Sequence, residues 1–205
     1  FQTVLFPTYI IVSKHKYKII TTVALAFFST GQTIKKRTLC SANVLFRKSS
    51  IIDSLYEEFL NTKWGRKYKN KVQITPCSFT DLEKFYPENK EKTIVFCGRL
   101  IKEKNPLLVI EAANLLNRDI LKEWKIYVIG DGYLKKDVND LINNYGLNNH
   151  VFQLSTMNVE KYVNKSSIFL SLQEKENYPS QSLIEAMAAS NAIIATDVGE
   201  TRKLV

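Results

Sequence analysis

The sequence predicts an α/β fold in which a parallel sheet carries helices on both faces. From Lys92 onward, short β-branched or aromatic runs alternate regularly with amphipathic segments of helical period. The connections between these segments are also short. Strands that alternate with helices over short connections are typical of a parallel sheet whose crossover helices cover its two faces. We therefore expect residues 92–205 to form a Rossmann-like domain.

The predicted strands follow the apolar runs of this region. They are Thr93–Cys97, Lys125–Ile129, Val151–Leu154, Ile168–Ser171 and Ala192–Ala195. Helices are predicted between them at Pro106–Leu116, Leu134–Tyr145, Val159–Asn164 and Ser182–Ala189. Pro106 suits a first helical turn, because the N–H that proline lacks is not needed there.

The first 91 residues are less regular. They predict a strand at Asn43–Phe46, a helix at Ile51–Leu60 and a basic loop at Trp64–Lys71. A polar connection then follows Pro76 and runs to Glu91. We therefore divide the chain into a partial first domain (1–75), a linker (76–91) and the α/β domain (92–205).

Charge is distributed unevenly along the chain. Of its 205 residues, 45% are hydrophobic and 24% are charged, the balance of an ordinary globular protein. Residues 1–75 hold 13 Lys and Arg but only 3 Asp and Glu, whereas the net charge of the whole chain is +9. A basic half indicates either an anionic partner, such as nucleic acid or an acidic membrane, or a plain solvated face. We expect no nucleic-acid partner, because aromatic side chains do not alternate with the cations in a recognised module.

The cysteines and the longest apolar run restrict the cellular context. Cys40, Cys77 and Cys97 have neither metal-ligand spacing nor the even number of a disulfide framework, which favours a reducing cytoplasm. The apolar run Ile19–Phe28 is much shorter than the roughly 20 residues that span a bilayer.

A cationic loop follows the first strand of the α/β domain. Gly98 permits a tight turn, and Arg99 and Lys104 lie five residues apart before a predicted helix. An Arg fork, a Lys point charge and a helix N-terminus suit a diphosphate, although the spacing taken alone favours ordinary solvated charge.

Three more loops follow predicted strands, at the edge where parallel sheets bind ligands. Gly130-Asp131-Gly132 is either a plain turn or the border of a phosphate site. The acidic stretch Glu174–Ser182 leads into a helix on which apolar residues flank Glu185. That carboxylate either faces solvent or, if buried, needs partners such as the two hydroxyls of a ribose. Thr196–Thr201 is a further strand-end turn.

Together these motifs resemble the retaining glycosyltransferases of family 4, which have the two-domain GT-B fold. The resemblance rests on Gly98-Arg99-Leu100 with Lys104, on Val128–Gly132, on Glu185–Ala188, on Ala195–Glu200 and on the linker-like Thr75–Phe85. It covers about residues 40–205. It implies that 92–205 is a nucleotide-sugar-binding domain truncated at its C-terminus and that 1–75 is part of an acceptor-side domain.

The resemblance also assigns roles to residues. It implies that Arg99 and Lys104 neutralise the donor diphosphate, that Glu176 contacts the transferred sugar and that Glu185 contacts the ribose. The implied catalytic residues are Glu176, Arg99 and Lys104, and the implied donor-binding residues are Gly98, Arg99, Lys104, Gly132, Ser155, Thr156, Asn177, Tyr178, Ser180, Gln181, Ser182, Leu183 and Glu185. The two glutamates have one more residue between them than the family pattern, so Glu174 is an alternative to Glu176.

The expected activity is transfer of a hexosyl group from a UDP- or GDP-linked sugar to a glycan or lipid-linked acceptor, with retention. No Asp-x-Asp pair occurs in the chain, so we expect neither a metal nor another cofactor. The basic half is interpreted as a contact for the inner face of an anionic membrane, which makes the protein cytoplasmic and peripheral. A sugar-nucleotide epimerase of similar fold and a basic nucleic-acid-binding protein are the alternatives. Because acceptor-side elements are missing, we expect the chain alone not to catalyse transfer.

Overall fold

The computed structural model describes residues 20–23, 36–54, 57–75, 80–175 and 177–205. The chain divides into two compact units, Phe1–Cys77 (unit 1) and Ser78–Val205 (unit 2).

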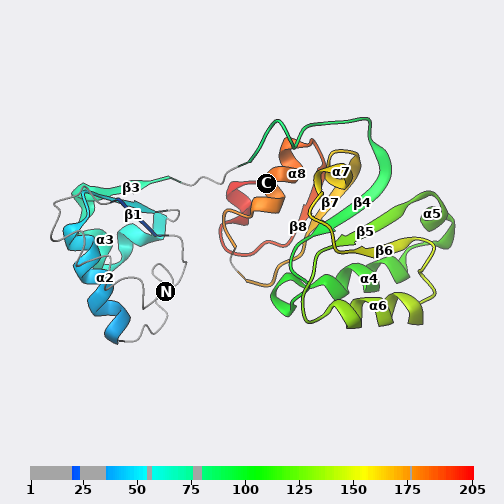
Figure 1. The fold of residues 1–205 in the computed structure, drawn as a ribbon, viewed down its shortest axis with the longest axis horizontal. Helices are drawn as coiled ribbons and strands as arrows, with labels where there is room; N and C mark the ends of the chain where they lie inside the picture. The colour runs from blue at the N-terminus through cyan, green and yellow to red at the C-terminus, as the bar shows by residue number, and fades with distance from the viewer. Residues whose placement is uncertain (1–19, 24–35, 55–56, 76–79, 176) are drawn as a thin grey trace. The chain divides into compact units, whose positions relative to one another are not determined.

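Unit 2 is built on one parallel sheet. Its strands are β4 (Glu91–Cys97), β5 (Lys125–Ile129), β6 (Val151–Leu154), β7 (Ser166–Ser171) and β8 (Ala192–Ala195), in the order β6-β5-β4-β7-β8. All neighbouring strands pair in parallel, and Phe96 of β4 lies opposite both Val128 and Leu170. The five predicted strands and the parallel α/β fold are confirmed (Figure 1).

Helices cover both faces of this sheet. On one face lie α4 (Pro106–Leu115), α5 (Arg118–Glu123) and α6 (Lys135–Asn144), and on the other lie α7 (Glu160–Val163) and α8 (Gln181–Ala188) (Figure 1). Short 3-10 turns, η4 (Lys102–Lys104) and η5 (Thr201–Lys203), follow β4 and β8. Along β4, Val95 packs beneath α7 and α8 whereas Phe96 packs beneath α4 and α6, since successive residues of a strand face opposite sides. Both faces are therefore core, which explains the continuous apolar runs in the sequence.

The four predicted helices of unit 2 are confirmed within one residue at each end. The sequence did not predict α5. This helix begins after Asn117, whose side chain accepts a hydrogen bond from the Asp119 N–H at 2.8 Å, and it buries Leu121 fully. A capped helix of six residues is too short to produce a clear helical period.

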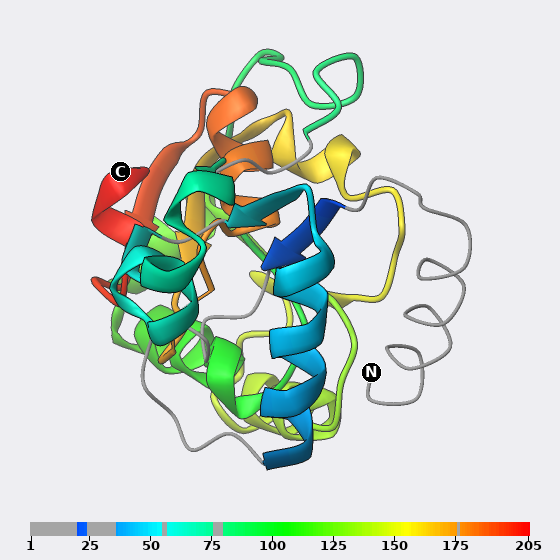
Figure 2. The same cartoon turned by 90° about the vertical axis from the view of Figure 1, so that its left-hand side faces the viewer.

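Unit 1 contains a three-stranded parallel sheet, ordered β1 (Ile20–Val23), β2 (Ile51–Ser54) and β3 (Val72–Ile74). The helix α2 (Lys36–Lys48) runs beside it, followed along the chain by η2 (Glu57–Asn61), α3 (Lys63–Lys67) and η3 (Lys69–Lys71) (Figure 2). Its core consists of Ala42, Phe46, Ile52 and Phe59, with Trp64, Tyr68 and Val72 packed against them.

The three predictions for elements of unit 1 were wrong. Asn43–Phe46 belongs to α2, where Ala42 and Phe46 are buried one helical turn apart. The segment predicted as a helix begins with β2, in which Ile52 and Ser54 are buried and Ile51 is exposed, an alternation with period two. The predicted loop at Trp64–Lys71 is α3 and η3, because the Thr62 hydroxyl accepts a hydrogen bond from the Gly65 N–H at 3.0 Å and caps the helix.

Candidate functional site

Three loops meet at the carboxyl end of the unit 2 sheet. Main-chain hydrogen bonds join the loop after β4 to the end of β5, from the Gly98 N–H to the Ile129 carbonyl at 3.0 Å and from the Leu100 N–H to the Asp131 carbonyl at 2.8 Å. The loop after β7 joins η4 through the Glu174 N–H, which donates to the Glu103 carbonyl at 2.9 Å. This edge is therefore held together by backbone contacts.

Two glycines make this close approach sterically feasible. A Cβ on Gly130 would lie 1.9 Å from the Gly98 carbonyl oxygen, and one on Gly132 would lie 2.4 Å from the Leu100 carbonyl oxygen. Both glycines also have a positive φ, 149° and 155°. Only glycine satisfies both conditions, so these residues bring the Gly-Asp-Gly turn against the cationic loop.

A pocket of about 320 Å³ opens between the cationic loop and the loop after β7. Its lining residues are Arg99, Ile101, Glu103, Lys104, Gln173, Lys175 and Asn177. The Lys104 ammonium donates a hydrogen bond to Gln173 Oε1 at 2.8 Å. Burial and the positive charge of Arg99 lower the pKa of Lys104. Lys104 is partly buried and Arg99 is exposed, and both line the same pocket. Two neighbouring cations of this kind favour an anionic ligand.

Glu185 lies on α8, which begins immediately after the loop that follows β7. Burial raises the pKa of its carboxyl, while a hydrogen bond from Gln181 Nε2 at 3.0 Å and the charge of Lys84 oppose that rise. Burial also raises the pKa of the Cys97 thiol to about 11, and the charge of Glu185 adds to the effect. Glu185 therefore lies near the carboxyl end of β4, although it is not among the residues that line the pocket.

Asp131 organises the neighbouring turn. Its carboxylate accepts hydrogen bonds from Lys135 at 3.1 Å and from the Gly132 N–H at 2.8 Å, which lower its pKa. The Ser155 hydroxyl donates to the Gly130 carbonyl at 3.1 Å, so this side chain joins the loops after β5 and β6. Thr156 accepts a hydrogen bond from the Asn158 N–H at 3.1 Å.

The structure places the predicted residues at one sheet edge but in different surroundings. Arg99, Lys104 and Asn177 line the pocket, and Gly98, Gly132, Ser155 and Thr156 lie in the adjoining loops. The side chains of Tyr178, Ser180 and Leu183 are buried, Gln181 is exposed and Ser182 is partly buried, all at the start of α8. Glu176 lies outside the described residues, and its alternative Glu174 is exposed.

The sequence did not single out four of the lining residues, Ile101, Glu103, Gln173 and Lys175. Gln173 carries a detectable signal, since it is a polar residue directly after an apolar strand at the ligand-binding edge of the sheet.

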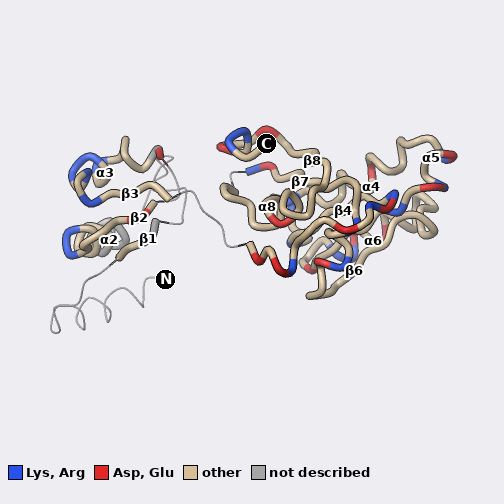
Figure 3. Tube along the Cα trace, turned by 90° about the horizontal axis from the view of Figure 1, so that it is seen from above, with Lys and Arg blue, Asp and Glu red and all other residues tan. Residues whose placement is uncertain are grey.

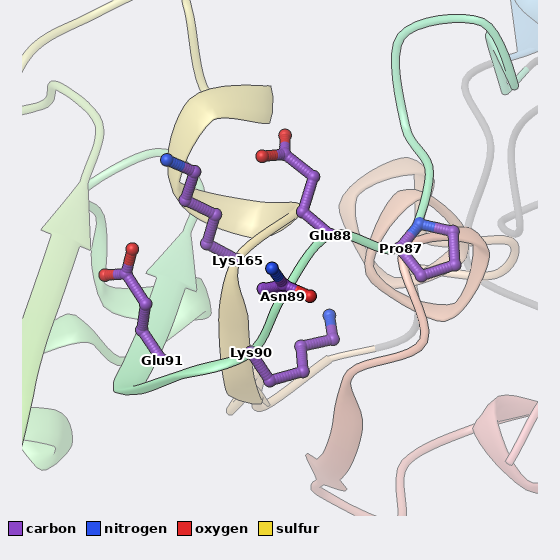
Figure 4. A pocket seen from close by; sticks show the side chains of 6 residues that line it. All are labelled: Pro87, Glu88, Asn89, Lys90, Glu91 and Lys165. Carbon is purple, nitrogen blue, oxygen red and sulfur yellow. The ribbon is translucent and has the colours of Figure 1, made fainter.

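A second pocket, of about 660 Å³, lies at the opposite edge, where β4 and β7 begin. It is lined by residues 87–91 and by Lys165 (Figure 4). The Lys90 ammonium is bonded there to the Asn164 carbonyl at 3.0 Å and the Ala189 carbonyl at 2.5 Å. Those bonds hold the segment before β4 against the rest of unit 2. We therefore take the smaller pocket as the candidate functional site.

Two kinds of feature are absent from the described residues. In that part of the chain, no helix is long and apolar enough to cross a bilayer. Within the same ranges, no three His, Cys, Asp or Glu side chains are grouped so that they could hold a metal ion.

The chain is similar to curated proteins of Campylobacter jejuni. It is 36% identical over 109 residues to N-acetylgalactosamine-N,N'-diacetylbacillosaminyl-diphospho-undecaprenol 4-alpha-N-acetylgalactosaminyltransferase, a match that covers 53% of the chain and 28% of the relative. A second transferase of the same organism, which adds α-1,4-linked N-acetylgalactosamine to an undecaprenol-linked saccharide, is 30% identical over 78 residues, or 38% of the chain and 22% of the relative. The matched region thus spans about a quarter of each relative.

Solved structures share the fold. HepE from Anabaena, crystallised with UDP, superposes with a TM-score of 0.78 at 13% identity, over 100% of this chain and 60% of its own. A glycosyltransferase from Rickettsia africae superposes with a TM-score of 0.68 at 19% identity, over 94% of this chain and 55% of its own. These neighbours have the GT-B fold, which agrees with the fold predicted from the motifs.

The family itself is identified from the sequence of unit 2. Residues 78–205 match the family described as glycosyl transferases group 1. This region contains the cationic loop, the Gly-Asp-Gly turn, the loop after β7 and Glu185. It also makes up more than half of the chain, so the chain belongs to the glycosyl transferases group 1 family.

Proposed function

We propose that this chain supplies the donor-binding part of a retaining, family 4 glycosyltransferase that transfers a hexosyl group from a nucleotide diphosphate sugar. The observation that carries the proposal is the pocket in which Arg99 and Lys104 meet at the carboxyl end of the sheet. The family match favours a transferase over the epimerase alternative. Because the matched region spans only about a quarter of the curated relatives, the activity is proposed for the whole protein.

The chemical role of the two cations follows from the reaction. When the sugar leaves a nucleotide diphosphate, negative charge develops on the departing diphosphate. Arg99 offers a planar fork for phosphate oxygens, and the partly buried Lys104 ammonium offers a point charge that water screens only weakly. Groups fixed in place before the reaction stabilise that charge without reorganising.

The ribose and the sugar would lie on either side of this diphosphate site. Glu185, as a carboxylate, would accept hydrogen bonds from ribose hydroxyls, and the backbone at the start of α8 would face the sugar and phosphate. By resemblance, Glu176 or Glu174 would contact the transferred sugar. We propose UDP as the first nucleotide to test, because HepE was crystallised with UDP, and GDP as the second.

The proposed acceptor is a glycan or a lipid-linked saccharide. Both Campylobacter relatives are named for undecaprenol-linked acceptors, which supports the lipid-linked choice. We further propose that unit 1 contacts an anionic membrane. In Figure 3, Lys and Arg gather on α2 and α3, whereas Asp and Glu are concentrated in unit 2. Basic surfaces of this kind bind acidic lipid headgroups.

The diphosphate assignment is tested with the substitution Arg99→Ala. Calorimetric titration should show UDP, or GDP if that base is preferred, binding about 100-fold more weakly, because paired charge-assisted hydrogen bonds are lost. Binding of the nucleoside alone should change less than twofold. Arg118→Ala, on the exposed surface of α5, serves as the control and should leave both affinities unchanged. Equal weakening of nucleotide and nucleoside would contradict the assignment.

We also propose that donor binding needs no divalent metal, since Arg99 and Lys104 supply the positive charge. Titrating the nucleotide diphosphate with and without a chelator should give affinities within threefold of each other. A loss beyond tenfold, about 1.4 kcal/mol, would show that a metal takes part.

A further inference from the structure

Gln173 is buried beside the pocket, with only 3% of its surface exposed. It lies just past the end of β7, and its backbone carbonyl accepts a hydrogen bond from the Thr196 hydroxyl at 2.6 Å. Thr196 follows β8, so two neighbouring strand ends fix the position of Gln173. A buried glutamine held in this way presents its side-chain oxygen in one place.

Lys104 needs such a fixed partner. Its side chain has four rotatable bonds, and burial together with the like charge of Arg99 disfavours the charged ammonium in this pocket. The hydrogen bond to Gln173 Oε1 at 2.8 Å opposes both effects. An ammonium has three N–H donors, so one acceptor from the protein leaves donors to face an anion. The amide is also neutral, whereas a carboxylate at this position would cancel the charge of Lys104.

We infer that Gln173 is a positioning residue, which holds the Lys104 ammonium toward the diphosphate of the bound donor. The inference rests on the proposed function, because it assumes that the pocket binds a diphosphate. It adds a residue from the loop after β7 to the two cations of the loop after β4. The main-chain hydrogen bond between Glu174 and Glu103 already joins the two loops, and these residues are the chain neighbours of Gln173 and Lys104.

The first measurement is the affinity of the 205-residue chain for inorganic pyrophosphate, which needs no knowledge of the base. Gln173→Met keeps the length of the side chain but removes the acceptor, and it should weaken pyrophosphate binding about tenfold. Gln73→Met, the same change at an exposed position of β3, should have no effect. In a Lys104→Met background, Gln173→Met should cause no further loss, because a positioning residue acts only through its partner.

The pH profile adds a readout that a purely structural role would not change. The charged groups that line the pocket around Lys104 are Arg99, Glu103 and Lys175, and none of them is altered in the variant. Removing the acceptor disfavours the charged ammonium, so the pKa of Lys104 falls further. The pyrophosphate affinities of Gln173→Met and of the wild type are compared at each pH. The affinity of Gln173→Met should begin to decline at a lower pH than that of the wild type.

The outcomes separate this inference from the proposed function. If Arg99→Ala leaves pyrophosphate binding unchanged, the proposed function fails. If Arg99→Ala weakens binding but Gln173→Met does not, or if Gln173→Met costs as much in the Lys104→Met background, the inference alone fails. If Gln173→Met is unfolded at the assay temperature, Gln173→Asn replaces it in the same comparison. Asparagine keeps the amide, but its side chain is too short to reach the Lys104 ammonium.

Discussion

Glu185 is subject to two opposing requirements. Its partly buried position on α8 raises the pKa of the carboxyl, so the ionised form is disfavoured in the folded protein. The proposed contact with ribose hydroxyls needs that same ionised form. A group whose folded pKa is raised adds stability only at low pH, and that stability is lost as the pH rises through the ordinary carboxyl pKa and then the raised one. At neutral pH this carboxylate therefore weakens the fold at the place where it would bind ligand.

Glu185→Gln should consequently stabilise the chain slightly at pH 8 while weakening the binding of a nucleoside diphosphate about tenfold. Its amide oxygen still accepts the hydrogen bond from Gln181, so packing is preserved. Thermal denaturation should show a raised midpoint relative to wild type at pH 8 and little difference near pH 4, where both side chains are neutral. A lower midpoint at pH 8 would mean that the charge of Lys84 outweighs burial.

Single residues of the site were predictable to different degrees. Arg99 and Lys104 stand out because one cation directly follows a strand-end glycine and the other lies five residues later, before a predicted helix. The pairing of Lys104 with Gln173 joins residues that are distant along the chain, so only the folded sheet places them together. The sequence is compatible with either a solvent-facing or a buried Glu185, and the structure shows the side chain partly buried.

Among the elements, the turn after β5 depends most strongly on its residue type. Gly130 combines a φ of 149° with a backbone contact that leaves no room for a Cβ. The oxygen that it meets belongs to Gly98, which precedes Arg99. A displaced turn would therefore move the cationic loop as well.

Gly130→Ala should cost on the order of 3 kcal/mol of unfolding free energy, because the backbone must shift as well as adopt a strained φ. Gly146→Ala is the matched control. Gly146 also has a positive φ, 64°, but a Cβ there would meet nothing within 4 Å, so the expected cost is only about 1 kcal/mol. Urea denaturation of both variants measures the difference in unfolding free energy. Equal losses would show that the strain of a positive φ alone accounts for the destabilisation.

Elements were predicted well in unit 2 and poorly in unit 1. A parallel sheet covered on both faces requires uninterrupted apolar strands, and these are visible in a sequence. In unit 1, β2 and β3 are three or four residues long, and their burial alternates or is only partial. The helix α2 is hard to predict because Asn43, β-branched Val44 and Leu45 separate its buried residues Ala42 and Phe46, and Val44–Phe46 is an apolar run that resembles a strand.

The whole chain separates its charge between units. The exposed cations of α3 and η3 include Lys63, Lys67 and Lys69, whereas unit 2 is close to neutral. If unit 1 contacts a membrane, charge reversal should matter only there. Replacing Lys63 and Lys69 by Glu should reduce binding to vesicles containing anionic lipid by about tenfold or more, since each basic residue near the surface contributes about 1 kcal/mol.

The control replaces Lys136 and Lys161, two exposed lysines of unit 2, by Glu, which changes the net charge equally. Co-sedimentation with vesicles of phosphatidylglycerol and phosphatidylcholine, at low and at physiological salt, compares the two double variants. A similar loss for both would indicate attraction governed by net charge rather than by a surface of unit 1.

The order of strands in unit 2 also affects how the protein is made. The strand at the centre of the sheet, β4, is the first of the five to leave the ribosome. One of its partners, β5, is synthesised next, but the other, β7, emerges only after β6. During that interval one hydrogen-bonding edge of an apolar strand has no native partner, and such edges pair readily with other chains. We therefore expect nascent unit 2 to be prone to association with other chains until β7 has been translated.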